Sequence, residues 1–182
     1  MTARIPPAVE RRSFSEVRAV GRKLEGYAAT FNSEARLGSF VETIAPGAFR
    51  SALAGDVLAL MDHDPGKVLG RTRSGTLKLF EDTRGLGFSL DVPDTQAGRD
   101  VLALAERADL GGMSFGFTVP KGGEDWNGEK RTLRQIGLKE ISVVSAWPAY
   151  PDTEIALRAL QRGAEAHRRA RVLIMAELAA WG

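Results

Sequence analysis

The sequence contains no cysteine, only two histidines and no long apolar run. Without cysteine the chain has no disulfide, no thiolate metal ligand and no cysteine nucleophile. Its apolar stretches fall short of the roughly 20 residues that a membrane-spanning helix needs. The N-terminus, "MTARIPPAVERRSF", is polar and lacks the apolar run of a signal peptide. We therefore expect a cytoplasmic protein without a membrane partner.

Charge of either sign is not in large excess either. The 25 lysines and arginines and 23 aspartates and glutamates leave a net charge of +2, which argues against nucleic acid as a direct substrate. Neither a Walker-type nor a GxGxxG phosphate-binding motif occurs, and two distant histidines without cysteine do not favour a transition-metal site. The sequence therefore predicts no metal and no cofactor. Five arginines near the C-terminus fit an acidic partner or a solvated helix face equally well.

The residues that are present indicate one domain of ordinary size. The chain has 182 residues, of which 43% are hydrophobic, enough to bury a core. Six to eight short stretches alternate as strands do, and helices are expected over residues 46–54, 95–108 and 153–180. We predict an α+β fold with a mostly antiparallel, barrel-like β core surrounded by helices, and a C-terminal helix. Residues 1–20 are expected to form a flexible arm, 21–157 the domain, and 158–182 a helical tail.

One of the two histidines lies at a position that is typical of active sites. His63 ends the apolar strand "VLALMDHD" (57–64), before an expected turn at "PGK", and such a position lies at the rim of a sheet, where active sites often collect. His167 lies among arginines in a polar helical stretch and is interpreted as a solvated surface residue. Without a partner, His63 too would be a hydrogen-bonded turn residue.

The stretch "ADLGGMSFGFTV" (108–119) supplies a candidate nucleophile, Ser114. Large apolar side chains alternate there with glycines, and Gly111, Gly112 and Gly116 leave room for a substrate carbonyl. A serine nucleophile needs a neighbouring base, and backbone N–H groups must hold the oxyanion. The alternative is that these glycines mark a bulge or a close strand crossing, with Ser114 a passive filler.

A third group should orient the base, and Glu140 in "LKEISVV" is the best candidate. It shares a strand face with Leu138, Ser142 and Val144, where a carboxylate needs a partner. An edge-strand glutamate that bends into water is the alternative reading. Four aspartates remain as substitutes for the third group: Asp62, Asp64, Asp82 and Asp152.

Taken together, these segments resemble the prohead (procapsid maturation) proteases of tailed bacteriophages. The resemblance runs from about Glu25 to Arg158, and its blocks occur in the family's order. They are "GYAATFN", "ETIAPGAF", "LMDHDPGKVLGRTRSGTLKLFEDTRGLGFSLDVPDT", "GGMSFGF" and "LKEISVVSAWPAYPDTEI". The segments "DHDPGKVLGRT" and "MSFGF" are the most specific.

The resemblance implies a serine endopeptidase with a fold similar to the herpesvirus capsid-maturation proteases. It assigns the family's histidine to His63 and its nucleophile to Ser114. The strand "LKEISVV" resembles the one that bears the third triad residue in the herpesvirus enzymes, which assigns that role to Glu140. The oxyanion donors, near the glycines or in the loop after Val144, stay open.

The resemblance also implies a place of action and a set of partners. Family members act inside the immature procapsid in the bacterial host cytoplasm, where they cleave the scaffolding segment of the major capsid protein and usually themselves. The partners expected here are therefore the major capsid protein, its scaffolding segment and the chain itself, and a homo-oligomer fits as well. The alternative is a catalytically silent capsid-assembly or scaffold-binding module on the same fold.

Overall fold

The computed structural model describes residues 9–14 and 17–145, of which 53% lie in strands and 8% in one helix. The strands are β1 (Glu10–Phe14), β2 (Val17–Val20), β3 (Lys23–Thr30), β4 (Ala35–Leu37), β5 (Phe40–Ile44), β6 (Leu58–Met61), β7 (Asp64–Arg71), β8 (Leu77–Glu81), β9 (Gly85–Asp91), β10 (Gly112–Thr118), β11 (Glu124–Asn127), β12 (Lys130–Leu133) and β13 (Gly137–Val144). The helix is α1 (Gln96–Glu106). Strands thus dominate the described part of the chain.

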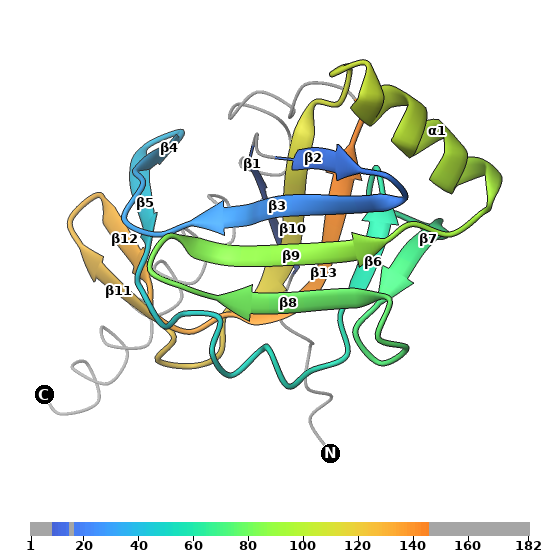
Figure 1. Cartoon of the computed structure of the whole chain (residues 1–182). Coiled ribbons are helices and arrows are strands. Elements are labelled where there is room, and N and C mark those ends of the chain that lie inside the picture. Colours follow the sequence, from blue (N-terminus) through green and yellow to red (C-terminus); the bar gives the residue numbers. More distant parts are fainter. Residues whose placement is uncertain (1–8, 15–16, 146–182) are drawn as a thin grey trace, which may run out of the picture. The chain divides into compact units, whose positions relative to one another are not determined.

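The strands form three open sheets (Figure 1). A five-stranded sheet has the order β1-β10-β13-β6-β7, and two four-stranded sheets have the orders β11-β12-β5-β4 and β2-β3-β9-β8. Pairing is mostly antiparallel, but β12 pairs with β5 and β13 with β6 in parallel. The prediction of an α+β fold with a barrel-like core surrounded by helices is therefore wrong: the described residues are mostly β, form no closed barrel, and have one helix beside the sheets. Alternating patterns show which strands exist, but closure depends on pairing between distant segments.

The segment 46–54, expected to be a helix, is a series of turns. Gly47 has a φ of +90°, which no right-handed helix accepts. The backbone N–H of Phe49 donates to Glu81 Oε2 at 3.0 Å, and the carbonyl of Ala48 accepts from the N–H of Ile136 at 2.9 Å. The segment keeps short-range hydrogen bonds, such as that from the N–H of Ala52 to the carbonyl of Phe49 at 2.8 Å. Contacts with distant parts of the chain hold it in this series of turns, because a segment so short does not form a stable helix by itself.

The helix expected over 95–108 is confirmed as α1. Thr95 caps its N-terminus, because its side chain accepts from the N–H of Gly98 at 3.2 Å. Val101 and Leu102 are buried against the core. The helix predicted over residues 153–180 lies outside the described residues, and so does His167.

By its internal contacts the chain divides into two units, Met1–Pro148 and Ala149–Gly182, and the described residues all belong to the first. The described part of the expected N-terminal arm includes β1 and β2, each paired in a sheet. No helix among the described residues is long and apolar enough to cross a bilayer.

One hydrophobic core draws on all three sheets. Strand β10 supplies Met113, Phe115 and Phe117, each at most 1% exposed. The ring of Phe115 packs edge-on against Phe49 with centroids 5.7 Å apart. The apolar face predicted for this strand is thus confirmed. Because side chains alternate along a strand, Ser114 lies on the opposite face of β10.

Candidate active site

The order of the five-stranded sheet places the three candidate residues on consecutive strands. Ser114 lies on β10, Glu140 on the adjacent β13, and His63 in the turn after β6, which pairs with the other edge of β13. In the register between β10 and β13, Gly116 lies opposite Glu140 and Ser114 opposite Ser142. Three segments that are distant in the sequence are therefore gathered at one place.

His63 lies in a two-residue turn between β6 and β7. Met61 pairs with Asp64, so the turn consists of Asp62 and His63. Their φ angles are +52° and +59°, the left-handed conformation of a type I′ turn, which normally favours asparagine, aspartate and glycine. The turn predicted at "PGK" is therefore wrong, since those residues belong to β7. A histidine in this conformation is strained, and such strain is typical of functional positions.

The carboxylate of Asp62 ties this turn to the end of β13. It accepts hydrogen bonds from the backbone N–H of Ser145 at 2.8 Å and from the Ser145 hydroxyl at 2.7 Å. The turn that carries His63 is thus fastened to the strand that carries Glu140. This contact fixes the distance between the two residues.

The imidazole of His63 and the carboxylate of Glu140 are directly paired. His63 Nδ1 lies 2.7 Å from Glu140 Oε1, and the side chains are 20% and 9% exposed. The second oxygen, Oε2, accepts the hydroxyl of Ser142 at 2.6 Å, and Arg11 Nε lies 3.7 Å from Oε1. With Nδ1 held by the carboxylate, Nε2 is the ring nitrogen left for a proton transfer.

Gly116 makes room for this pair. A Cβ at Gly116 would lie 2.5 Å from Glu140 Oε1 and 3.1 Å from its Cδ. The carboxylate of Glu140 therefore lies over the bare backbone of β10.

The other two glycines of this stretch lie at the start of β10. Gly112 has a φ of +131°, and the N–H of Gly111 donates to the carbonyl of Val144 at 2.8 Å.

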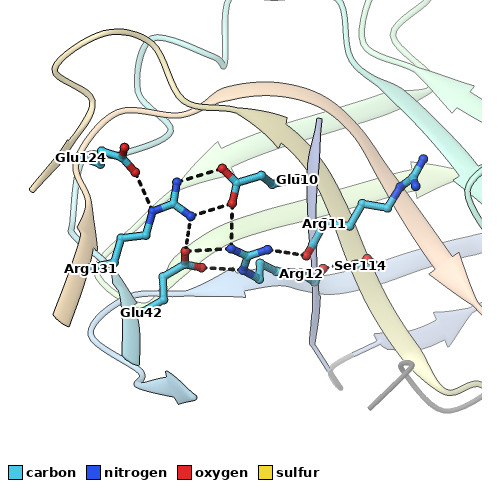
Figure 2. A network of polar contacts seen from close by, with 7 residues as sticks. All are labelled: Glu10, Arg11, Arg12, Glu42, Ser114, Glu124 and Arg131. Carbon is cyan, nitrogen blue, oxygen red and sulfur yellow. Dashed lines mark hydrogen bonds and ion pairs between the residues drawn. The ribbon is translucent and has the colours of Figure 1, made fainter. Parts of the chain in front are cut away.

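Ser114 is completely buried, with 0% of its surface exposed. Its hydroxyl donates to the backbone carbonyl of Arg12 at 2.7 Å, as Figure 2 shows. In the part of the chain that the structure describes, no hydrogen bond joins Ser114 to His63. Strand β1 pairs with β10 in register across Ser114, with Ser13 opposite it. The side-chain hydroxyl is therefore covered by the N-terminal strand.

A cluster of buried charges holds β1 in this position (Figure 2). Arg12 makes a two-pronged contact with Glu42, at 2.5 and 2.8 Å, and a third contact with Glu10 at 2.9 Å. Arg131 binds the same two carboxylates, Glu42 at 2.8 Å and Glu10 at 2.6 and 2.8 Å, and also Glu124 at 2.6 Å. Such paired, charge-assisted contacts are among the strongest hydrogen bonds in proteins. We call these residues, Glu10, Arg12, Glu42, Glu124 and Arg131, the ionic cluster.

The ionic cluster changes the acidity of its members. Burial on its own raises the pKa of Glu10, but hydrogen bonds and charge from Arg131 and Arg12 outweigh it and hold that pKa below its ordinary value. Burial on its own lowers the pKa of Arg12, yet Glu42 and Glu10 raise it overall. The guanidinium of Arg12 also lies 5.3 Å from the ring centroid of Phe117. Glu10 and Arg12 are therefore kept ionised by their partners.

The aspartates weighed as substitutes for Glu140 have other partners where the structure describes them. Asp62 binds Ser145, as above. Asp64 Oδ1 accepts from the N–H of Gly66 at 2.8 Å, and Asp82 accepts from Tyr27 at 2.6 Å. Asp152 lies outside the described residues.

The sequence placed Ser142 on the same strand face as Glu140 but assigned it no role, and it did not identify Arg12 as a neighbour of the site. Ser142 lies two residues after Glu140 on the same face of β13, so its position in "LKEISVV" was a usable signal. Nothing in the sequence indicates that Arg12 lies beside Ser114, because the pairing spans about one hundred residues.

A histidine–carboxylate pair beside a serine on consecutive strands has the side-chain types of a serine hydrolase. No cluster of metal-ligating side chains occurs within residues 9–14 and 17–145. Residues 9–169 match the family described as caudovirus prohead serine protease, and the chain belongs to that family. Comparison with curated proteins gave no match.

The structure of the bacteriophage T4 capsid assembly protease, gp21, is similar to this one. The TM-score is 0.54 at 12% sequence identity, and the match covers 79% of this chain and 99% of that chain. At this identity the likeness concerns the fold alone. The sequence-based resemblance to prohead proteases is thus confirmed by the family match.

Proposed function

We propose that the protein is a serine endopeptidase of procapsid maturation, with Ser114 as nucleophile, His63 as general base and Glu140 as the group that orients the imidazole. The observation that carries the proposal is the 2.7 Å contact between His63 Nδ1 and Glu140 Oε1, made next to the strand that bears Ser114. The left-handed turn at Asp62 and His63 supports it, because strain of this kind accompanies function.

In the proposed reaction, Ser114 Oγ attacks the scissile carbonyl carbon while its proton passes to His63 Nε2. The imidazolium then gives the proton to the leaving amine, and the peptide bond breaks to leave an acyl-enzyme. Water, deprotonated by the same nitrogen, releases the acyl group. Glu140 holds the ring and stabilises its charged form.

The proposed oxyanion donors are backbone N–H groups around Gly111, Gly112 and Gly116 or in the loop after Val144. Because the N–H of Gly111 is already bonded to Val144 in this structure, that group contributes only if the end of β10 shifts. Backbone N–H groups on the other edge of β10 face β1, which pairs with it from Met113 to Phe117.

The proposed substrates are the scaffolding segment of the major capsid protein and the chain itself, inside the immature procapsid of the bacterial host. Family membership supports this choice, since the family is one of prohead proteases. The similar T4 protein is a capsid assembly protease. Residues 158–182 are proposed as a segment that is removed or that binds the capsid.

Co-expression with the major capsid protein of the same phage tests the catalytic assignment. Intact mass should show a shortened capsid protein with the wild-type chain and none with Ser114→Ala or His63→Ala. Glu140→Gln should slow cleavage by a smaller factor, up to about 10⁴. Ser89→Ala, on a strand of another sheet, is the matched control and should cleave normally. Unchanged cleavage with Ser114→Ala would falsify the assignment.

One observation favours the second candidate, a silent assembly module on the same fold. The Ser114 hydroxyl is buried and bonded to Arg12 rather than to His63. In that case the wild-type chain and Ser114→Ala would both leave the capsid protein intact, while both would still bind it in the procapsid.

A further inference from the structure

Both backbone edges of β10 are occupied. On one side β13 pairs with it from Gly112 to Thr118, and on the other side β1 pairs with it from Met113 to Phe117. A protease substrate bound in extended form beside Ser114 needs a free strand edge for its main-chain hydrogen bonds. Strand β13 cannot leave, because it carries Glu140 and pairs with β6. The place of β1 is therefore the edge that a substrate can take.

The contacts of β1 are those expected of a bound peptide. It runs antiparallel to β10 in unbroken register. The carbonyl of Arg12 is the one nearest to the nucleophile, 2.7 Å from Ser114 Oγ. A peptide that followed the same register would present its own carbonyl to Ser114 at that position. Arg12 thus stands where the residue that supplies the acyl group would lie.

The side chain at that position meets a carboxylate. Arg12 reaches Glu42, which is 2% exposed, and lies over the ring of Phe117. When β1 leaves, it removes Glu10 and Arg12 together. Glu42 and Glu124 then face Arg131 alone, two negative charges against one positive charge. Three carboxylates face two guanidinium groups while β1 is in place, and two face one without it, so the excess of one negative charge is unchanged. What Glu42 loses is its direct contact with the guanidinium of Arg12, and an incoming arginine or lysine replaces that contact.

We propose that β1 is a built-in occupant of the substrate-binding edge of β10, held by the ionic cluster. An extended peptide with a basic side chain at the position of Arg12 binds there once β1 has left. The inference rests on the proposed function, since it takes Ser114 as the nucleophile. It adds a mode of substrate binding and a specificity residue, Glu42, to that function.

Labelling of Ser114 by a fluorophosphonate tests the occupancy. The serine oxygen attacks phosphorus, fluoride leaves, and the hydroxyl proton passes to His63. Arg12→Ala in the full chain should label Ser114 about tenfold faster or more, the size expected for the loss of a charged hydrogen bond. Arg18→Ala on β2, whose side chain is 75% exposed, is the matched control and should label at the wild-type rate.

Amide hydrogen exchange gives a second readout that does not need catalysis. In Arg12→Ala, β10 amides that face β1 should exchange faster by a similar factor, while those of β3 and β9 stay protected. If Arg12→Ala exposes β3 and β9 as well, the chain has unfolded, and the milder Glu10→Gln is compared instead.

A peptide of residues 9–15, VERRSFS, tests the specificity. Added to Arg12→Ala, it should slow labelling, and the same peptide with glutamate in place of Arg12 should not. Equal labelling rates in wild type, Arg12→Ala and Arg18→Ala would overturn the occupancy while leaving the proposed function intact. Absence of Ser114 labelling in all three chains overturns both. Equal effects of the two peptides overturn the role of Glu42.

Discussion

At the scale of single residues, the candidate site depends on the absence of a side chain at Gly116. The carboxylate of Glu140 lies over the bare backbone of Gly116, at a distance where no Cβ fits. The position is opposite Glu140 in the register of β10 and β13. A glycine there lets the carboxylate reach His63, and the register of β10 and β13 shifts directly after it, between Gly116 and Phe117.

Gly116→Ala should therefore lower kcat for capsid-protein cleavage by about tenfold or more, with little change in KM. The added methyl group displaces the carboxylate from His63, which leaves the imidazole without its orienting partner. Cleavage kinetics on a capsid-protein peptide measure the effect.

Gly122→Ala is the matched control for Gly116→Ala. A Cβ there meets nothing within 4 Å, but φ is +78°, so the substitution should lower the free energy of unfolding by about 1 kcal/mol. Its kcat should stay at the wild-type value. A normal kcat for Gly116→Ala would show that Glu140 does not act through this contact.

At the scale of elements, the turn between β6 and β7 carries the proposed base, and its conformation is held from outside. The sequence "DHDPGK" contains a stronger turn signal, Pro-Gly, just beyond it. The turn falls at Asp62 and His63 because Asp62 bonds to Ser145, about eighty residues later. The residues around the turn do not show that Asp62 has a hydrogen-bond partner so far along the chain, so its position could not be predicted from them.

Asp62→Ala should lower both stability and activity. It removes two hydrogen bonds to Ser145 and puts alanine in a left-handed conformation, which together should lower the free energy of unfolding by about 1–3 kcal/mol. Urea denaturation measures that change. A looser turn also displaces His63, so kcat should fall beyond what the unfolded fraction explains.

Asp64→Ala, on the other side of the same turn, serves as control for Asp62→Ala. Its carboxylate bonds only to local partners, Gly66 and Lys67. Its kcat should match the wild type. If both variants lose activity equally, the anchor to Ser145 has no special role in placing the base.

At the scale of the whole molecule, the sequence predicted the features that depend on residues close to one another in the chain. The alternation of Met113, Phe115 and Phe117 predicted the buried face of β10, and the helix expected over 95–108 is found as α1, capped by Thr95. The sheet order, the open sheets and the ionic cluster were not predictable, because each depends on pairing across many residues. The pairing of His63 with Glu140 followed from chemical complementarity and family resemblance, and the geometry agrees with it.

Stability should depend on pH through Glu10. Its pKa is lowered in the folded chain from an ordinary value of 4.5, so its contribution is complete above that value and is lost as pH falls through the lowered pKa. Wild type should thus lose stability below about pH 4.5 more steeply than Glu10→Gln. At pH 7 the variant should be less stable by about 1.5–3 kcal/mol.

Urea denaturation of wild type and Glu10→Gln between pH 7 and 3 measures the difference. The difference between the two curves reports Glu10 together with the contacts that it makes with Arg131 and Arg12. Parallel curves would mean that Glu10 gains nothing from Arg131 and Arg12 on folding.

The position of β13 also sets the order in which a newly made chain becomes complete. Of the described strands it is the last to be synthesised, yet it lies at the centre of its sheet, between β10 and β6. Until it inserts, the segment that carries the imidazole and the segment that carries the hydroxyl have no common neighbour. A chain still on the ribosome, or cut short before residue 137, therefore holds an unassembled site.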